Sequence, residues 1–367
     1  MKDDIRFIRA RQRWSTDNRR RNAMLTLIAV GLVCGALFLA SRFADEYQIR
    51  ILNMVAIYIT LAVSYNLING ITGQFSLEPN AFVALGAYSA SLMTMTPLEK
   101  EMNFIIDPCV PWLAHICVPF LPAIIIGGLT AAVFALFMGF PVFRVRGDYL
   151  AIVTLGFGEV IRVVANNMQT VTNGPLGLKG IALYTDLRWT WGLALVTLFV
   201  IVRLVNSSYG RALKAIRENE LAAESMGINS FRHKLLAFTV AAFFEGMAGA
   251  MLAHLITTIS PMLFTFFLTF NLLIIIVLGG LGSLTGSVIA AIAFTWGSEL
   301  LRAVEEPTNV FGWFTIPGIP GMRMVIFAVL LIAAMLFWRE GIMGRKEFSW
   351  QWFLGLFSRR EKGAKIV

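Results

Sequence analysis

Long apolar runs separated by short polar intervals dominate this sequence. Ten of the runs approach the length of a membrane span, and they cover residues 23–40, 49–69, 81–96, 120–140, 149–165, 189–205, 235–256, 264–281, 288–301 and 324–338. A helix needs about 20 apolar residues to cross the hydrocarbon core of a bilayer, so the shorter runs predict helices that are tilted, broken or re-entrant. The pattern predicts an all-α polytopic membrane protein with about ten transmembrane helices.

The composition excludes an ordinary soluble domain. Of the 367 residues, 57% are hydrophobic and 14% are charged, whereas soluble domains carry about 25% charged residues. The net charge of +9 does not indicate nucleic-acid binding, because the Lys and Arg residues concentrate in a few segments. Such segments stay on the cytoplasmic side of a membrane, so the charge reports orientation.

Ten spans place the most basic segments on one side: the N-terminal tail, Arg144 and Arg146, the interval 206–234, and the chain after residue 338. Nine or eleven spans would place strongly basic segments outside the cytoplasm, so we expect ten spans with both termini in the cytoplasm. A count of eight spans would also keep both termini there.

The expected organisation is a basic cytoplasmic tail over residues 1–22, a transmembrane domain over 23–340, and a second basic cytoplasmic tail over 341–367. We interpret the run 23–40 as an uncleaved first span, because the apolar core of a signal peptide is only about 7–15 residues long.

The interval 206–234 is the longest polar stretch between two apolar runs, and it carries the signals of two short helices. Ser208 can cap a helix over 211–217, and Asn219 can cap a second helix over 220–226. Gly227 follows where a left-handed residue ends a helix. Two capped helices between spans suit docking of a soluble partner, and a loop solvated by its charges is the alternative.

The sequence ELAAESMG over residues 220–227 resembles the E-A-A-x-x-x-G coupling motif of ABC-transporter membrane subunits. With GRALKAIRENE before it and GIN at 227–229, the stretch is similar to the branched-chain amino acid permease family, in particular its M-type subunit. The resemblance implies a cytoplasmic coupling helix that docks in a groove of a separate ATPase subunit. Its coupling residues would be Glu220, Ala222, Ala223, Glu224 and Gly227.

The segment 66–80 is polar and breaks helical continuity between two apolar runs. Non-helical backbone at membrane depth is tolerated only where protein or a water-filled cavity satisfies its hydrogen bonds. The segment is therefore a candidate lining of the solute pathway. A plain cytoplasmic turn is the alternative. Its candidate polar residues are Asn66, Thr72, Gln74, Ser76, Glu78 and Asn80. Residues 73–88 also resemble a motif of the same family, in which Glu78 stands where a glycine is usual and Pro79 where His or Tyr is usual.

A further match to the family is RGDYLAIVTLGFGE over residues 146–159. Glu159 and Arg162 lie three residues apart on one helix face and can neutralise each other. An ionisable residue within a span is a functional candidate, and a buried structural ion pair is the alternative. The sequence TNGPLG at 172–177 suits a tight turn and resembles the outer turn of the family.

Two later segments are rich in small residues. FFEGMAGA over 243–250 has small residues three or four apart, which predicts close helix packing in lipid. Glu245 stands in it where the family usually has a small residue, and it is a further candidate pathway carboxylate. LGGLGSLTG over 278–286 resembles another family segment and predicts close packing or a broken helix rather than a phosphate loop, because no lysine follows it.

Several kinds of chemistry lack support in the sequence. There is no P-loop pattern, no metal-ligand spacing among the His and Cys residues, and no Ser/His/Asp arrangement. We therefore expect no enzyme activity and no cofactor in this chain. Cys109 and Cys117 share one predicted outer loop, where a disulfide and two free thiols are both open.

The resemblance implies the transmembrane permease subunit of a bacterial ABC importer for branched-chain amino acids in the cytoplasmic membrane. The implied partners are a second, homologous permease subunit, two ATPase subunits that bind the ATP, and a periplasmic or lipid-anchored solute-binding protein. A urea or short-amide importer is the nearest alternative. An ion-coupled secondary transporter, with Glu78, Glu159 or Glu245 as the coupling carboxylate, is an alternative from another class.

Overall fold

A computed structural model describes residues 21, 24–26, 28–144, 147, 149–305, 308–310, 314–316, 321–337, 341–344 and 347. The chain divides into two compact units, one of residues 1–49 with 347–367 and one of residues 50–346. Nearly all of the predicted tails 1–22 and 341–367, and Arg146 of the RGDY motif, lie outside the described residues.

The smaller unit contains the apolar helix Met24–Phe43, which is long enough to cross a membrane. This helix corresponds to the predicted first run. Near its end the guanidinium of Arg42 lies over the ring of Phe38, 5.9 Å from the ring centre.

Three helices form the centre of the larger unit: α3 (Pro79–Thr94), α6 (Phe120–Val142) and α12 (Ser230–Ile256). Glycines let their backbones approach closely. A Cβ at Gly86 would collide with the carbonyl of Gly246, and one at Gly246 would lie 2.7 Å from the carbonyl oxygen of Gly127. Helix association in lipid depends on such close packing. The close approach of these backbones confirms the close helix packing predicted from the small residues of 243–250.

The first helix of this unit ends in a distorted turn. Helix α2 (Glu46–Asn66) continues into a π-helical turn, η1 (Leu67–Ile71), and residues 73–78 are not helical before α3 begins. The predicted break in helical continuity is therefore confirmed. Its backbone is partly satisfied within the chain, because the amides of Thr72 and Gln74 donate to the carbonyls of Leu67 and Ile68.

A second break separates α13 (Phe266–Gly279) from α14 (Leu284–Glu305). Gly280 and Gly282 have φ values of 110° and 93°, which glycine adopts without strain. The break and the close approach of Gly279 to Gly286 confirm the expectation for the glycine-rich segment 278–286. Helix α15 (Met322–Phe337) packs against α13 and α14.

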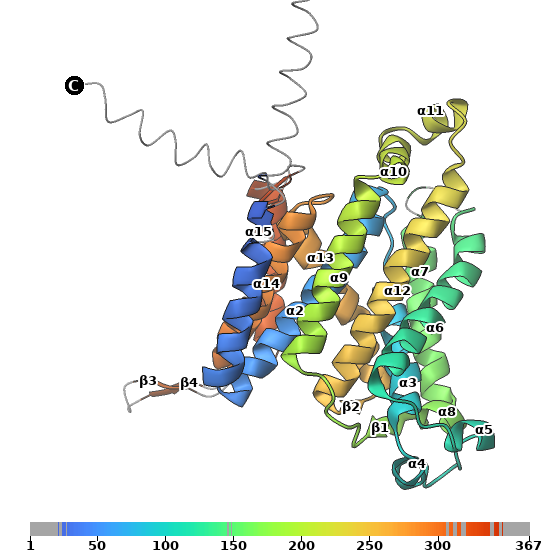
Figure 1. Cartoon of the computed structure of the whole chain (residues 1–367), viewed down its shortest axis with the longest axis vertical. Helices are drawn as coiled ribbons and strands as arrows, with labels where there is room; N and C mark the ends of the chain where they lie inside the picture. The colour runs from blue at the N-terminus through green and yellow to red at the C-terminus, as the bar shows by residue number, and fades with distance from the viewer. Residues whose placement is uncertain are drawn as a thin grey trace, which may run out of the picture. The chain divides into compact units, whose positions relative to one another are not determined.

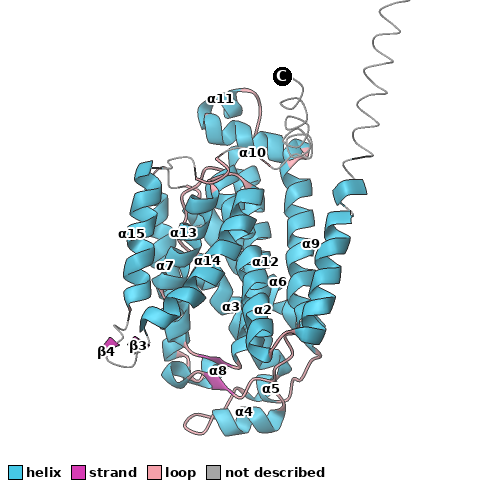
Figure 2. Cartoon of the chain, turned by 90° about the vertical axis from the view of Figure 1, so that its left-hand side faces the viewer, coloured by secondary structure: helices cyan, strands magenta, loops and turns pink. Residues whose placement is uncertain are grey.

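The remaining elements are two long helices and a set of short elements at the two ends of the larger unit (Figure 1). Helices α7 (Tyr149–Asn167) and α9 (Leu187–Val205) run along it, and α10 (Ser208–Glu218) and α11 (Glu220–Ser225) lie at one end. Figure 2 shows the short elements gathered at the opposite end. They are α4 (Pro97–Asn103), α5 (Pro111–Ala114), α8 (Gln169–Thr172), η2 (Gly174–Leu176), η3 (Pro261–Phe264) and the strand pairs β1 (Leu178–Lys179) with β2 (Thr258–Ile259) and β3 (Thr308–Val310) with β4 (Phe314–Ile316).

Among the described residues, seven helices are long and apolar enough to cross a membrane: Met24–Phe43, Glu46–Ile71, Phe120–Val142, Tyr149–Asn167, Leu187–Val205, Ser230–Ile256 and Leu284–Arg302. Each of the other three predicted runs also contains a helix, but α3 and α15 have 16 residues and α13 has 14. The structure is that of an all-α membrane protein. The count of ten spans stays a prediction.

Candidate functional site: the polar helix pair and the helix breaks

The interval between α9 and α12 folds into the two expected short helices. Ser207, and not Ser208, caps the first, because its hydroxyl accepts hydrogen bonds from the amides of Tyr209 and Gly210. This helix runs from Ser208 to Glu218 and is longer than the predicted 211–217, because Ser208 to Gly210 already form its first turn. Two adjacent serines made the capping residue ambiguous in the sequence.

The second helix has the expected caps. Oδ1 of Asn219 accepts from the amide of Ala222 at 3.0 Å. Gly227 has φ +85°, and the amide of Ile228 donates to the carbonyl of Ala223 at 3.1 Å, which closes the C-terminal turn. Asn229 then caps α12 by accepting from the amide of Arg232. A six-residue helix is marginal by itself, so these caps fix its position.

Side chains tie the helix pair to the start of α12. Nζ of Lys234 donates to Oε1 of Glu220 at 2.6 Å, and Lys234 is only 6% exposed. The ring of Tyr209 stacks on His233 with centres 4.2 Å apart, and its hydroxyl donates to the carbonyl of Arg232. Partial burial raises the pKa of Tyr209 further above neutral pH, where its hydroxyl is protonated and can donate.

The predicted coupling residues fall into two groups. Glu220 and Ala223 face the chain itself, since Glu220 is ion-paired and Ala223 is buried. Ala222, Glu224 and Gly227 are exposed. Two apolar neighbours that the sequence analysis did not select, Leu221 and Met226, are 65% and 83% exposed. Leu221 lies in α11 and Met226 directly follows it, so the exposed side of this short helix carries apolar as well as charged side chains.

Asn66 joins the two helix breaks. Its Oδ1 accepts from the amide of Gly282 at 2.9 Å, and its Nδ2 donates to the carbonyl of Ser283 at 2.9 Å and to the hydroxyl of Ser287 at 2.7 Å. Asn66 is completely buried. A buried amide with several partners fixes its neighbours, because an unpaired group there would be costly.

Buried hydrogen bonds also hold the chain between η1 and α3. The carbonyl of Ser76 accepts from the hydroxyl of Tyr65 at 2.7 Å and from Nδ2 of Asn69, and the amide of Ser76 donates to Oδ1 of Asn69. The hydroxyl of Ser76 donates to Glu78, and that of Thr72 to the carbonyl of Ile68.

The family motif on α7 packs against this segment. The amide of Leu77 donates to the hydroxyl of Thr154 at 2.9 Å. Beyond the segment, Nδ2 of Asn80 donates to the carbonyl of Phe264, and its Oδ1 accepts from the hydroxyl of Thr269. The structure thus brings together two motifs that lie far apart in the sequence.

The candidate carboxylates differ in their surroundings. Glu78 and Glu245 are fully buried, and within the described chain Oε1 of Glu78 and both oxygens of Glu245 have no hydrogen-bond partner. Glu159 pairs with Arg162 at 2.7 Å, as expected, but their side chains are 38% and 32% exposed. Within this chain the pair is half-exposed, because this part of α7 lies at the surface of the chain. Gln74 is half-buried. The pathway role of these residues stays a prediction.

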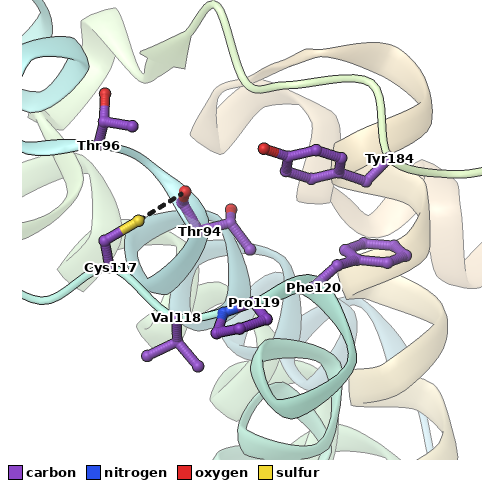
Figure 3. A pocket seen from close by; sticks show the side chains of 7 residues that line it. All are labelled: Thr94, Thr96, Cys117, Val118, Pro119, Phe120 and Tyr184. Atoms are coloured by element: carbon purple, nitrogen blue, oxygen red, sulfur yellow. Dashed lines mark hydrogen bonds between the residues drawn. The ribbon is translucent and has the colours of Figure 1, made fainter.

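A cavity of about 460 Å³ lies near the opposite end, lined by Thr94, Thr96, Cys117, Val118, Pro119, Phe120 and Tyr184. Figure 3 shows the rings of Phe120 and Tyr184 across the cavity from Thr96 and Cys117. The ring of His254 packs on Phe120 and forms a hydrogen bond with the hydroxyl of Thr94 at 2.8 Å. The residues of the predicted pathway do not line this cavity.

The end of the larger unit that carries α4, α5 and α8 contains a polar residue that the sequence did not single out. Nζ of Lys100 donates to the carbonyls of Leu113 and Ile116 at 2.7 and 2.6 Å, which ties α4 to the chain around α5. Cys109 and Cys117 are free thiols in the structure. Residues 172–177 form the expected tight turn, with Asn173 and Gly177 at positive φ. Within the described residues, no group of three His, Cys, Asp or Glu could hold a metal ion.

These features define a polytopic α-helical membrane protein with a capped polar helix pair between two spans. Residues 47–335 match the family described as "Branched-chain amino acid transport system / permease component". The chain belongs to this family.

Individual relatives agree with that assignment. The chain is 35% identical over 292 residues to "High-affinity branched-chain amino acid transport system permease protein LivM" of Escherichia coli (strain K12), a match that covers 70% of this chain and 64% of the relative. It is 24% identical over 311 residues to the LivH permease protein of Salmonella typhimurium, covering 79% of this chain and 92% of the relative. The match therefore spans slightly less than two thirds of the length of the LivM relative.

Proposed function

We propose that this chain is the transmembrane permease subunit of an ABC importer that moves leucine, isoleucine and valine across a bacterial cytoplasmic membrane. The observation that carries the proposal is helix α11. It is capped at both ends, tied to α12 by the pair of Glu220 and Lys234, and exposes Leu221 and Met226. A transporter driven by an ion gradient has no need of such a helix.

The proposed partners follow from the family. Two separate ATPase subunits bind and hydrolyse the ATP, and one of them receives α11. A second, homologous permease subunit completes the membrane part; the matches to both LivM and LivH proteins support such a pairing. A periplasmic or lipid-anchored binding protein delivers the solute at the end that carries α4, α5 and α8. In this arrangement the chain has ten spans, and α10, α11 and both tails lie in the cytoplasm.

The proposed mechanism uses the connection from α11 to the centre of the fold. ATP-driven closure of the ATPases pulls on α11, and the ion pair of Glu220 with Lys234 carries the displacement into α12. Helix α12 packs tightly on α3 and α6, so its movement changes the packing of the whole centre. The permease switches from outward-open to inward-open, performs no covalent chemistry, and offers weak solute contacts along the segment of Asn66 to Asn80.

Solute uptake by the full assembly tests this proposal. Proteoliposomes that contain both permease subunits, the ATPases and the binding protein are given ATP and labelled leucine, valine or urea. Uptake of leucine and valine that requires ATP is the expected result. Uptake of urea alone would show that the solute is urea or a short amide instead of a branched-chain amino acid. Uptake that follows an ion gradient without ATP would overturn the proposal in favour of Glu78, Glu159 or Glu245 as a coupling carboxylate.

A further inference from the structure

The side chain of Arg217, in the last turn of α10, reaches both helix breaks. A Cβ at Gly73 would lie 2.7 Å from Cγ of Arg217 and 3.3 Å from its Cβ. A Cβ at Gly282 would lie 2.6 Å from Nη1 of Arg217 and 3.6 Å from its Cζ. The aliphatic stem therefore lies on the first break and the guanidinium on the second. Both glycines have positive φ, at +69° and +93°, and leave the room that this side chain occupies.

The two breaks behave as one unit in the structure. Gly70 lies directly against the backbone nitrogen of Gly282. Asn66 accepts from the amide of Gly282 and donates to the carbonyl of Ser283, so α2 is fixed to the start of α14. A displacement of either break is therefore passed to the other, and a side chain that contacts both can move the pair together.

The position also suits an arginine electrostatically. Arg217 lies in the last turn of α10 and contacts Gly73, which follows the end of η1 at Ile71, and Gly282, which follows the end of α13 at Gly279. The last carbonyl groups of a helix carry a partial negative charge that favours a nearby cation. The guanidinium is always charged and has five N–H donors in a plane, which match carbonyl groups freed at broken helices.

We propose that Arg217 is a positioning residue that transmits movement of the polar helix pair to the two helix breaks. The proposal rests on the proposed function, since it takes α10 and α11 as the segment moved by the ATPases. It assigns a second connection into the membrane part, separate from the pair of Glu220 and Lys234. Through Glu220 the motion enters α12, and through Arg217 it enters the ends of α2 and α13.

The test separates ATP hydrolysis from transport in the reconstituted full assembly. Arg217→Met keeps the length of the apolar stem but removes the charge. Arg217→Lys keeps the charge without the planar donor group. Arg203→Met is the matched control, because Arg203 is an exposed arginine near the end of α9 and outside the helix pair. Each preparation is examined for co-purifying ATPases, for the rate of ATP hydrolysis and for leucine uptake.

We expect the Arg217→Met assembly to stay intact and to hydrolyse ATP within about twofold of the wild-type rate. Its uptake per ATP should fall by about tenfold or more, a factor typical of lost coupling between two sites. Arg217→Lys should recover part of the uptake, and Arg203→Met should match wild type. Uptake per ATP that is unchanged in Arg217→Met would overturn the proposal. So would loss of the ATPases from the preparation, because Arg217 would then act in assembly.

A second variant covers the case in which Arg217→Met does not fold. Arg217→Gln keeps a polar side chain that can donate hydrogen bonds but removes the positive charge and shortens the side chain. It should show the same loss of uptake per ATP, and a folded Arg217→Gln assembly with wild-type uptake per ATP would overturn the proposal. A wild-type assembly without ATP-driven uptake would show that the proposed function itself has failed.

Discussion

Glu220, the first residue of α11, pairs with Lys234 near the start of α12, with Oε1 and Nζ 2.6 Å apart. Lys234 is 6% exposed and Glu220 is 29% exposed. The first glutamate of the coupling motif is thus engaged within its own chain. It holds α11 in place, and the exposed residues of this helix and the turn after it are Leu221, Ala222, Glu224, Ser225 and Met226.

Removal of Glu220 should destabilise the permease. Glu220→Ala leaves the buried ammonium of Lys234 without its carboxylate, at a cost on the order of 1–3 kcal/mol. The thermal unfolding temperature of the purified protein in detergent should fall, and the exchanged pair Glu220→Lys/Lys234→Glu should recover part of the loss. Glu224→Ala, an exposed change on the same helix, is the control and should have little effect. Equal unfolding temperatures for the two alanine variants would contradict this role of the ion pair.

The effect of replacing Gly227 on the stability of α11 should depend only on how readily the new residue adopts the left-handed backbone conformation. No heavy atom lies within 4 Å of a Cβ at this position, so the only cost is that of φ +85°. Gly227→Ala should cost about 1 kcal/mol and Gly227→Asn less, because asparagine adopts the left-handed region more readily. Amide hydrogen exchange over residues 220–226 measures this directly. Faster exchange in the asparagine variant than in the alanine variant would refute the capping role.

Close packing of α3 on α12 should make Gly86 sensitive to a single methyl group. A Cβ there would collide with the carbonyl of Gly246, so Gly86→Ala must separate two backbones. We expect a loss of about 1–3 kcal/mol, the usual effect of overpacking. Gly156→Ala on α7 is the matched control, because nothing lies within 4 Å of its Cβ, and it should be neutral or slightly stabilising. Comparable unfolding temperatures for both variants would contradict the packing described.

Asn66 should be among the most sensitive polar residues. Asn66→Ala removes its hydrogen bonds to Gly282, Ser283 and Ser287 from a fully buried site, at a cost of about 2–3 kcal/mol. Asn206→Ala is the control, because Asn206 is exposed and bonds only within its own helix turn, to the carbonyl of Val202. Thermal unfolding distinguishes the two. A control as destabilised as Asn66→Ala would show that the junction of the breaks is not important for stability.

Local chemistry explains what the sequence could predict. Apolar run lengths indicated the order of the helices, Asn219 and Gly227 marked the ends of α11, and glycines marked the break before α14. These signals depend on neighbouring residues, whose spacing is visible in the chain. The one-residue error at Ser207 arose because either of two adjacent serines could cap α10.

Long-range contacts explain what the sequence could not predict. Asn66 was a candidate for the pathway, but its partners are more than 200 residues away, and nothing local indicates that its amide is used to join two helix breaks. Arg217 is one of several charged residues in the polar interval 206–234, and its reach to Gly73 and Gly282 depends on tertiary packing. Glu159 and Arg162 formed the expected pair, but their exposure depends on which face of α7 is covered.

ATP-driven leucine uptake by the full assembly tests the coupling role of α11 most directly. It is measured after the exposed apolar side chains of Leu221 and Met226 are replaced. Leu221→Ser/Met226→Ser alters only side chains that are 65% and 83% exposed, so the isolated permease should keep its unfolding temperature. This variant should lose both its co-purifying ATPases and its uptake. Uptake at the wild-type level, with the ATPases still bound, would contradict the claim that α11 couples this permease to ATP.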